Sequence, residues 1–453
     1  VCGLIGIIQK GKGKENLELI SSLSTIELVK RRGPDQIGLY QNDDLSLFHS
    51  RLVINSKPQE DKQPFVNKIE GNESILCFNG EIFNWKSISN KGNFVPIEGD
   101  TSSLFNHLNT FQVKKIKDLR GEFSFFFQSS FGDRYLVRDQ LGVKPLYYSQ
   151  GFQNGEKFLV FSTNFRSVAE VVSKKVGSSR LNTSSLRQFK EFRYVLDPHL
   201  TLFEGVLQVP PGHYLEITDD LDLIQKKYWE LPEGGVLRKG DFEEFTSLLN
   251  ESIDLRIPSL KKFGTFLSGG LDSGYLTLRS KDKAGFLGGF NLEVPGNENE
   301  DMRRDRFLSS ANIQNFSFPF ESSSNYIDRT FSAMDVPVGD SVLFLIEQLY
   351  SNSSHKANVF LGGDGADEVF GGYVHHKVFF LGNLFNKIFP GITKSIALKV
   401  IEKLPPGFYQ TFFPYKGSLN QEGVFKLAKF LRSFSRPGKA YKELVSLGGE
   451  MDE

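Results

Sequence analysis

Phe266-Leu267-Ser268-Gly269-Gly270-Leu271-Asp272-Ser273 is the stretch that decides the fold of the second half of this chain. The apolar run at residues 264–267 is typical of a buried strand, and it leads through serine and two glycines into a helix-like segment. Glycines let backbone N–H groups approach phosphate oxygens, while serine hydroxyls and a helix N-terminus add donors and positive potential. The loop lacks the Gly-Lys-Ser/Thr ending of a Walker loop. The pattern therefore predicts a phosphate-binding loop of another kind, with a generic glycine turn as the weaker alternative.

Strand-like and helix-like segments alternate on both sides of this loop. Residues 241–255 have the pattern of an amphipathic helix, and residues 285–290 and 359–362 are short apolar runs typical of buried strands. Such alternation favours an α/β fold with a doubly wound parallel sheet. We expect this domain to occupy residues 238–453.

A second glycine-rich loop, residues 361–373, follows the last of these strands and carries Asp364, Asp367 and Glu368. Acids among glycines just after a strand suit magnesium ligation or general-base catalysis beside a nucleotide. A solvated acidic turn is the alternative. The apolar pair Val369-Phe370 inside the loop argues against it.

The first 150 residues show a different pattern, of short strands separated by turn residues. Residues 16–30 repeat apolar side chains at helical spacing, and Asp100 is an N-cap candidate for a helix over residues 101–108. This mixture predicts a layered α+β domain over residues 2–217. The Pro-Pro-Gly turn at 210–212, the acidic pair at 219–220 and residues 232–235 indicate a linker after it.

Cys2 becomes the first residue of the chain if Val1 is removed, and a cysteine in that place carries its own base. A free α-amine has a pKa of roughly 7.7–8.0 and a thiol one of about 8.5, so near neutral pH the amine can take the thiol proton. A small buried residue on a first strand is the alternative for an isolated cysteine. We assign that structural role to Cys77, which lies inside an apolar strand.

A cysteine that cleaves an amide also needs oxyanion donors and groups that bind the charged end of its substrate. Asn79-Gly80 directly follows the apolar strand at 74–78, and its side-chain amide and a backbone N–H on a tight turn form a suitable donor pair. Arg51 is placed to bind an α-carboxylate through two hydrogen bonds, and Asp100 to accept from an α-ammonium.

Seven motifs of the N-terminal half occur in the order found in class II, N-terminal-nucleophile glutamine amidotransferases, and the domain resembles their glutaminase domain. They are Cys2-Gly3, Arg32-Gly33-Pro34-Asp35, residues 49–54, Gln63-Pro64, residues 79–84, Gly99-Asp100-Thr101 and residues 138–148. The resemblance implies an αββα sandwich with Cys2 as nucleophile and Asn79 with Gly80 as the oxyanion hole. It also implies a glutamine pocket formed by Arg51, Val53, Ile54, Glu81 and Asp100. Residues 138–148 point to the asparagine synthetase branch, and we treat them as structural or domain-coupling.

The second half resembles the ATP-pyrophosphatase-type domain of glutamine-hydrolysing asparagine synthetases, through residues 266–273 and 361–373. The resemblance implies ATP and Mg²⁺ as cofactors, with Asp272 and Asp367 as metal ligands and Asp364 as a catalytic residue needed to form the acyl-adenylate and accept ammonia. Asp301 is a further candidate ligand of the metal. The ATP-binding residues implied by the resemblance are Leu267, Ser268, Gly269, Gly270, Asp272, Ser273, Gly288, Gly362 and Gly363.

Composition sets the remaining expectations. The chain has 54 acidic and 54 basic side chains, which gives no support to a general binder of nucleic acid or anionic membranes. No apolar run reaches the length of a membrane span, no signal-peptide pattern is present, and two cysteines cannot build a disulfide framework. We expect a cytoplasmic enzyme with small-molecule substrates, with a homodimer as a possibility.

The resemblance implies that glutamine is hydrolysed to glutamate and ammonia, that aspartate is adenylated by ATP, and that ammonia, carried through a tunnel, converts the adenylate to asparagine. Three alternatives stay open: an amide-forming relative acting on a sugar, peptide or antibiotic-precursor carboxylate, a β-lactam-forming relative, and a non-catalytic or glutaminase-only variant. Cys2 with Asn79-Gly80 disfavours the β-lactam reading. The family's synthetase domain normally continues further, so we expect a C-terminally shortened variant or a fragment.

Overall fold

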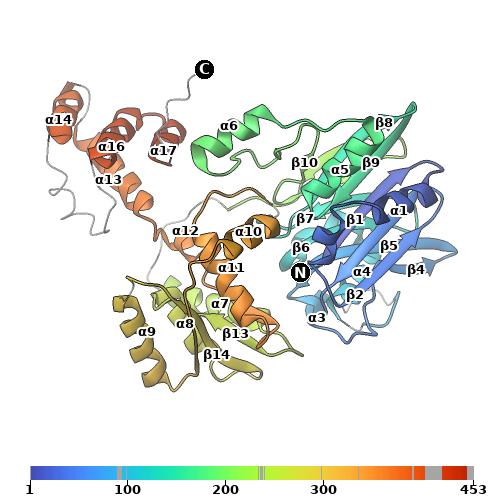
Figure 1. The fold of residues 1–453 in the computed structure, drawn as a ribbon, viewed down its shortest axis with the longest axis horizontal. Helices are drawn as coiled ribbons and strands as arrows, with labels where there is room; N and C mark the ends of the chain where they lie inside the picture. Colours follow the sequence, from blue (N-terminus) through green and yellow to red (C-terminus); the bar gives the residue numbers. More distant parts are fainter. Residues whose placement is uncertain are drawn as a thin grey trace. The chain divides into compact units, whose positions relative to one another are not determined.

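The computed structural model describes residues 2–88, 94–97, 99–232, 234, 238, 240–296, 298–334, 336–389, 392–403 and 421–445. The chain divides into two compact units. The first consists of Val1–Leu186 with Val195–Gly362, and the second of Arg187–Tyr194 with Gly363–Glu453. The first unit holds two antiparallel sheets and, after them, a parallel sheet (Figure 1).

Two six-stranded antiparallel sheets form the N-terminal part of the first unit. The first has the order β10-β8-β9-β1-β3-β2, and the second the order β12-β11-β7-β6-β5-β4. The strands of the first sheet are β1 (Gly3–Gln9), β2 (Gln36–Gln41), β3 (Leu45–Arg51), β8 (Tyr147–Gln153), β9 (Glu156–Ser162) and β10 (Leu207–Gln208). Those of the second are β4 (Phe65–Ile69), β5 (Asn72–Ile82), β6 (Gly121–Gln128), β7 (Arg134–Arg138), β11 (His213–Ile217) and β12 (Leu223–Lys227).

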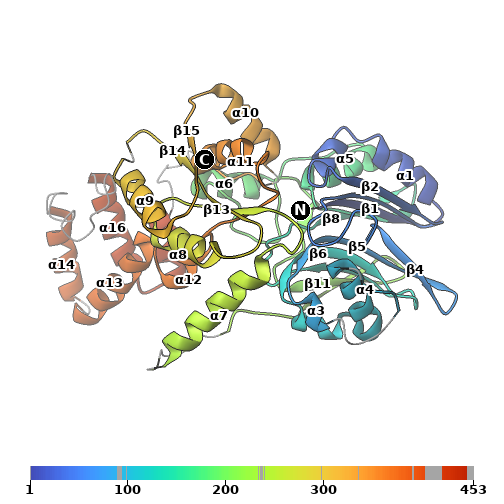
Figure 2. The ribbon, with the colours of Figure 1, turned by 90° about the horizontal axis from the view of Figure 1, so that it is seen from below.

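Three separate apolar cores hold these sheets in four layers, which Figure 2 shows from the side. One core lies between the sheets, a second under α1 (Gly13–Ser21), α2 (Ile26–Lys30) and α5 (Phe165–Val176), and a third under α3 (Trp85–Ile88), α4 (Asp100–Phe111) and η1 (Gln112–Asp118). The side chains of the central strands, such as β1, β5, β6 and β9, alternate between two of these cores, because successive residues of a strand point to opposite faces. The predicted αββα sandwich is confirmed.

The helix expected over residues 16–30 is instead two helices, α1 and α2, with a break between them. The break is stabilised by Glu170 of α5, whose carboxylate accepts hydrogen bonds from the backbone N–H and hydroxyl groups of Ser24 and Thr25. An anion at the N-terminus of α2 satisfies donors that have no partner inside the helix. A tertiary contact therefore ends a helix that the apolar spacing alone would continue.

One of the three segments expected to mark a linker lies inside the second sheet, while residues 233 and 235 of another lie outside the described residues. Asp219-Asp220 lies in the turn between β11 and β12, and β12 pairs along its length with β11. The expected boundary at residue 217 thus falls inside a hairpin that closes the edge of the sandwich.

The parallel sheet has four strands in the order β15-β14-β13-β16, and all of its pairs are parallel. Its strands are β13 (Phe263–Phe266), β14 (Phe286–Glu293), β15 (Asn315–Pro319) and β16 (Val359–Leu361). The helices of this part are α7 (Asp241–Arg256), α8 (Leu271–Ser280), α9 (Glu298–Ala311), α10 (Ser324–Ala333) and α11 (Val342–Ser353). The order reverses at β13, which places a topological switch point between the carboxyl ends of β13 and β16, where open α/β sheets bind ligands.

The second unit is helical in its described part. It contains α12 (Ala366–Phe370), α13 (Val374–Ile388), α14 (Ile392–Lys403), α16 (Gln421–Ser433) and α17 (Pro437–Val445), together with the end of α6 (Thr183–Phe192). Its apolar core includes Phe430 and Ala440, which are fully buried. No helix within the described ranges has both the length and the apolar character needed to cross a bilayer.

We expect Glu170→Ala to lower the free energy of unfolding by about 1–2 kcal/mol, because the N–H groups at the start of α2 lose their anionic partner. Chemical denaturation followed by circular dichroism measures this change. The matched control is Glu18→Ala on the exposed side of α1, expected to change stability by less than about 0.5 kcal/mol. Equal effects of the two substitutions would show that Glu170 does not stabilise the break.

Candidate functional site

Cys2 lies at one end of the space between the two antiparallel sheets. Leu4 and Ile8 of β1 belong to the core between the sheets, and the two-residue period of the strand places Cys2 on the same face. The side chain is 6% exposed, and burial raises the pKa of its thiol. Arg32 fixes the backbone there by donating from Nε to the carbonyl of Cys2 at 3.0 Å.

Asn79 and Glu81 face the same space from the second sheet. Ile75 and Cys77 of β5 belong to the core between the sheets, so alternation directs residues 79 and 81 to that face as well. Cys77 is fully buried in this core, where burial raises the pKa of its thiol, as expected of a structural cysteine. The strand period therefore brings the candidate nucleophile and Asn79 to facing sheets.

The predicted tight turn at Asn79-Gly80 is wrong, because β5 continues through both residues to Ile82. Pairing with β6 runs from Ile75↔Gln128 to Ile82↔Gly121 and overrides the local turn preference of Asn-Gly. Gly80 has φ 145°, and a Cβ built on it would lie 2.0 Å from the carbonyl oxygen of Glu122. Only glycine permits this close approach of the two strands.

The outer edge of β5 is open next to Gly80. β4 pairs with β5 only as far as Leu76. Beyond it, the N–H of Phe78 donates to Gln63 Oε1 (2.6 Å) and the N–H of Ile82 to Asp100 Oδ2 (3.1 Å). Alternation along the strand directs the Gly80 N–H to this same edge, where a substrate oxygen can accept from it. The geometry thus suits a backbone oxyanion donor.

Arg51, at the end of β3, also points into the space between the sheets, since Leu45 and Leu47 of that strand belong to its core. The buried guanidinium donates to Gln36 Oε1 (2.9 Å), to the carbonyl of Glu60 (2.6 Å) and to Ser56 Oγ. All three acceptors are uncharged. They hold the guanidinium in place without neutralising it, as a carboxylate-binding arginine requires.

The turn after β3 carries Val53, which is buried, and Ile54, which is partly buried. Asp35 shapes this turn: its Oδ2 accepts from the N–H of Val53 (2.8 Å), and its own N–H donates to the carbonyl of Arg51 (3.1 Å). The sequence motif contained Asp35 but gave it no role. In the structure it positions the backbone of the candidate glutamine pocket.

Three carboxylates gather at the far end of this pocket. Asp100 is the first residue of α4, and its N-cap is Gly99, so the N-cap predicted at Asp100 is one residue late. Burial, together with the neighbouring charges of Glu81 and Asp61, raises the pKa of Asp100 well above its usual range, and burial likewise raises that of Glu81. Asp61 was missed, because no local pattern marks a buried acid in a loop. An ammonium group bound among these carboxylates would reduce the repulsion between their negative charges.

The glycine loop after β13 passes close to the backbone of α9. Gly269 has φ 86°, and a Cβ there would lie 2.7 Å from the carbonyl of Glu300. Ser273 Oγ accepts from the Ser268 N–H (3.3 Å) and lies 3.2 Å from Ser268 Oγ, and α8 begins at Leu271. Backbone N–H groups, two hydroxyls and a ten-residue helix N-terminus meet at the carboxyl end of β13.

The residues around this loop are of types that fit a nucleotide and its metal ion. Leu267 is buried and lies 3.1 Å from a Cβ built on Gly289, next to Gly288, which has φ 149°. Asp272 is exposed in the first turn of α8. In the ranges that the structure describes, no three His, Cys, Asp or Glu side chains form a metal cage. Mg²⁺ commonly binds one or two carboxylates and substrate phosphates, so Asp272 suits it without a cage.

Asp301 has a different partner from the metal expected for it. Its Oδ1 forms an ion pair with NH1 of Arg304, a buried side chain that also contacts Asp305 at 3.2 Å. Arg304 lies behind the loop, with its Cβ 3.4 Å from a Cβ built on Gly269. The ion pair of Asp301 is therefore internal to α9, the helix whose backbone at Glu300 and Arg304 approaches Gly269.

Gly362 ends the first unit, directly after β16. In the second unit, Gly363 and Asp364 precede α12, and Asp367 lies in its first turn. The Tyr373 hydroxyl donates to Glu368 Oε1 (3.0 Å), and this hydrogen bond raises the pKa of Tyr373 to about 12. We expected the apolar pair Val369-Phe370 to argue against a solvated acidic turn. The two side chains are 75% and 55% exposed, so this argument fails.

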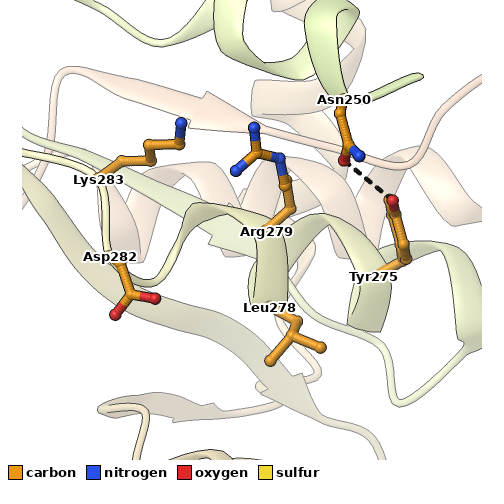
Figure 3. A pocket seen from close by; sticks show the side chains of 6 residues that line it. All are labelled: Asn250, Tyr275, Leu278, Arg279, Asp282 and Lys283. Atoms are coloured by element: carbon orange, nitrogen blue, oxygen red, sulfur yellow. Dashed lines mark hydrogen bonds between the residues drawn. The ribbon is translucent and has the colours of Figure 1, made fainter. Parts of the chain in front are cut away.

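Two surface pockets lie outside these loops. One, of about 450 Å³, lies beside the C-terminal half of α8 and the turn after it, away from the glycine loop at the N-terminus of α8 (Figure 3). Its lining residues are Asn250, Tyr275, Leu278, Arg279, Asp282 and Lys283. Asp254 pairs with both cations of the lining, Arg279 and Lys283 (2.7 Å for the lysine).

The second pocket, of about 410 Å³, is formed largely by the segment 138–148. Arg138, which is buried, donates to the carbonyls of Lys144 (2.9 Å) and Val209 (2.8 Å). Asp139 accepts from the N–H groups of Val143 (3.0 Å) and Lys144 (2.9 Å). These bonds fix the loop. The lining residues are Arg32, Arg138, Gly142, Val143, Lys144, Pro145, Tyr147, Gln208 and Val336.

Comparison with known families gives two matches. Residues 1–229 match the model of the glutamine amidotransferase domain, and residues 244–436 that of asparagine synthase. A putative glutamine-hydrolysing asparagine synthetase 2 of Methanocaldococcus jannaschii is 27% identical over 405 residues, which cover 83% of this chain and 76% of the relative. The glutamine-hydrolysing asparagine synthetase 1 of Bacillus subtilis is 26% identical over 422 residues, covering 90% of this chain and 64% of the relative.

Among solved structures, a glutamine phosphoribosylpyrophosphate amidotransferase of B. subtilis complexed with ADP and GMP aligns with 72% of this chain and 70% of its own. The sequence identity is 13% and the TM-score is 0.36. This score is too low to add to the fold described above.

We expect Asp100→Asn to stabilise the fold increasingly as the pH rises. A carboxyl whose pKa is raised on folding stabilises the folded state below its unfolded pKa of about 4, and that stabilisation is lost as the pH rises through the folded pKa. The asparagine avoids this loss and can still accept from the Ile82 N–H. Free energies of unfolding at about pH 5 and about pH 8 measure the difference; Asp118→Asn, at an exposed residue, is the control. If the difference in free energy of unfolding between Asp100→Asn and the wild type were the same at both pH values, the raised pKa of Asp100 would be contradicted.

Proposed function

Because the chain belongs to the glutamine amidotransferase family over residues 1–229 and carries an asparagine synthase domain over residues 244–436, we propose that it makes asparagine from aspartate with glutamine as nitrogen donor. Hydrolysis of glutamine is assigned to the N-terminal sandwich and synthesis to residues 238–453. The observation that carries the proposal is the common inter-sheet face of Cys2, Arg51, Asn79 and Glu81 at one end of the sandwich.

In the first reaction the Cys2 thiolate attacks the side-chain carbonyl carbon of glutamine. The C–N bond then breaks, ammonia leaves with the transferred proton, and water hydrolyses the thioester to glutamate. Because burial raises the pKa of the thiol, a base within reach of Sγ is required. An α-amine on residue 2 itself would supply that base, which requires cleavage of the peptide bond before Cys2. Asn79 Nδ2 and the Gly80 N–H stabilise the oxyanion.

The remaining pocket residues bind the ends of the substrate. Arg51 binds the α-carboxylate, while Glu81 and Asp100 bind the α-ammonium beside the turn formed by Val53 and Ile54. Glutamine carries both charges, and the buried arginine and the raised-pKa carboxylates provide one binding group for each.

In the second reaction aspartate is adenylated by ATP, pyrophosphate is released, and ammonia displaces AMP. Ser268, Gly269, Gly270 and Ser273 are assigned to the phosphates, and Leu267 and Gly288 to the base. Asp272 is assigned to Mg²⁺, which would screen the charge of the phosphates. The assignments of Gly362 and Gly363 to AMP, of Asp364 to catalysis and of Asp367 to Mg²⁺ rest on the family resemblance.

The decisive experiment incubates the protein with glutamine, aspartate and ATP-Mg²⁺ and identifies the products. We expect asparagine, glutamate, AMP and pyrophosphate. Relatives at 22–27% identity do not determine which carboxylate is the acceptor substrate. If AMP forms only with another carboxylate, such as a sugar acid or peptide, that compound and not aspartate is the acceptor. Glutamate without AMP under every condition would indicate a glutaminase alone.

Cys2→Ala separates the two reactions. We expect glutamine hydrolysis to fall by roughly 10³-fold or more, since the nucleophile is lost, while synthesis with ammonium chloride continues. Cys77→Ala is the control for loss of a buried thiol that takes no part in the chemistry. If Cys2→Ala also loses the ammonia-dependent reaction, the assignment of the two reactions to separate sites is wrong.

Gly269→Ala tests the phosphate loop. A Cβ at this left-handed residue meets the Glu300 carbonyl at 2.7 Å, so we expect AMP formation to fall by about tenfold or more, with glutamine hydrolysis unchanged. Gly274→Ala, one turn later in α8, meets nothing within 4 Å and should be neutral or slightly stabilising. Equal AMP formation in the two variants would exclude the loop from nucleotide binding.

A further inference from the structure

The Asn79 amide is joined to the residue opposite it in the sheet. Asn79 of β5 and Ser124 of β6 are direct partners in the antiparallel register, and both are fully buried. Phe126, two residues along β6, belongs to the core between the sheets, so Ser124 faces the same space as Asn79 and Cys2. Asn79 Nδ2 donates to Ser124 Oγ at 3.1 Å.

The Ser124 hydroxyl has a fixed direction. It donates its own proton to the carbonyl of Pro145 at 3.0 Å, so only its lone pairs face Asn79. Lone pairs can accept from the amide nitrogen but repel the amide oxygen. The serine therefore distinguishes the two ends of the Asn79 side chain, which are nearly equal in shape.

The other end of the amide does not set this orientation. Within the described part of the chain, Asn79 Oδ1 has no hydrogen-bond partner, although it is buried. A flipped amide would turn Nδ2, with both its protons, away from the serine. In the observed orientation one N–H is held by Ser124, and the second remains for the substrate oxygen.

The carbonyl that receives the serine proton is itself held in place. Pro145 follows Val143 and Lys144, whose N–H groups bind the buried carboxylate of Asp139. The acceptor of Ser124 is therefore part of an ordered loop, and the direction of the Ser124 hydroxyl follows from the backbone of segment 138–148. This gives that segment a link to the candidate oxyanion donor.

We propose that Ser124 is a positioning residue of the glutaminase reaction, which fixes the Asn79 amide with an N–H directed at the oxyanion. The proposal rests on the function proposed above and adds a residue that acts only through Asn79. The hydroxyl reduces the freedom of a side chain whose direction determines how well the developing charge is stabilised.

The test is a double-mutant cycle on glutamine hydrolysis with the full-length protein. Ser124→Ala should lower kcat by about tenfold with less than about a twofold change in KM for glutamine, because substrate binding is left to Arg51, Glu81 and Asp100. Asn79→Ala should lower kcat by roughly 10²–10³-fold. Ser124→Ala added to Asn79→Ala should change nothing further, since a positioning residue has no effect once its target is absent.

Two further measurements distinguish positioning from folding. Ser124→Thr keeps a hydroxyl in the strand and should retain most of kcat, and the unfolding temperature of each variant shows whether the sheet is intact. A kcat loss in Ser124→Ala that persists at full size in the Asn79→Ala background, or wild-type kcat in Ser124→Ala, overturns the role of Ser124. If Asn79→Ala or Cys2→Ala hydrolyses glutamine as wild type does, the proposed glutaminase site itself is wrong.

Discussion

The two edges of β5 end their pairing at different residues, and the candidate glutaminase site depends on that difference. β4 leaves the strand after Leu76, whereas β6 stays paired to Ile82. Residues 77–82 are therefore rigidly held on one side and open on the other. The open side binds Gln63 and Asp100 through backbone N–H groups, and the His49 ring contacts the carbonyl of Phe78 at 3.0 Å. A strand paired on both sides would have no backbone N–H left for a substrate oxygen.

Three ionisable side chains, one of them on this strand, are buried where a charge is costly. Burial raises the pKa of the Cys2 thiol and of the Glu81 and Asp100 carboxyls, and all of them would be more stable charged in water. His49 is buried in the same space, and burial lowers its pKa to about 4, so it stays neutral. The charged forms of these carboxyls are stabilised by a few hydrogen bonds, from Asn55 to Glu81 and from the Ile82 N–H to Asp100. No cation is among these partners. Such a pocket gains most from a ligand that brings its own ammonium, because binding then replaces repulsion with attraction.

Much of this architecture follows from the sequence, and the parts that do not share a physical cause. Short apolar runs between turn residues predicted strands of the first domain, and the glycine residues after residue 267 predicted a turn into a helix, because both depend on neighbours in the chain. The turn expected at Asn79-Gly80, the single helix over residues 16–30 and the missed roles of Asp61 and Ser124 all fail for another reason. Each is decided by a segment far along the chain: β6 for Asn79, Glu170 for the helix break, and Asp100 for Asp61. Local propensity contains no information about those partners.

Both candidate sites offer backbone N–H groups as donors, in a chain whose formal net charge is zero. At Gly80 and at Gly269 the backbone passes so close to a carbonyl, of Glu122 and of Glu300, that no side chain fits. The close approach fixes the direction of the neighbouring N–H groups. Preorganised backbone dipoles stabilise a developing charge without reorienting during the reaction, whereas a lysine would first have to be ordered and desolvated. A serine hydroxyl also contributes at each site. Ser124 orients the Asn79 amide, and Ser273 accepts a hydrogen bond from the Ser268 N–H within the glycine loop. The positive potential at both sites therefore comes from backbone N–H groups that close packing holds in place. We expect a glycine-to-alanine change at Gly80 or Gly269 to displace those groups and so to weaken the potential.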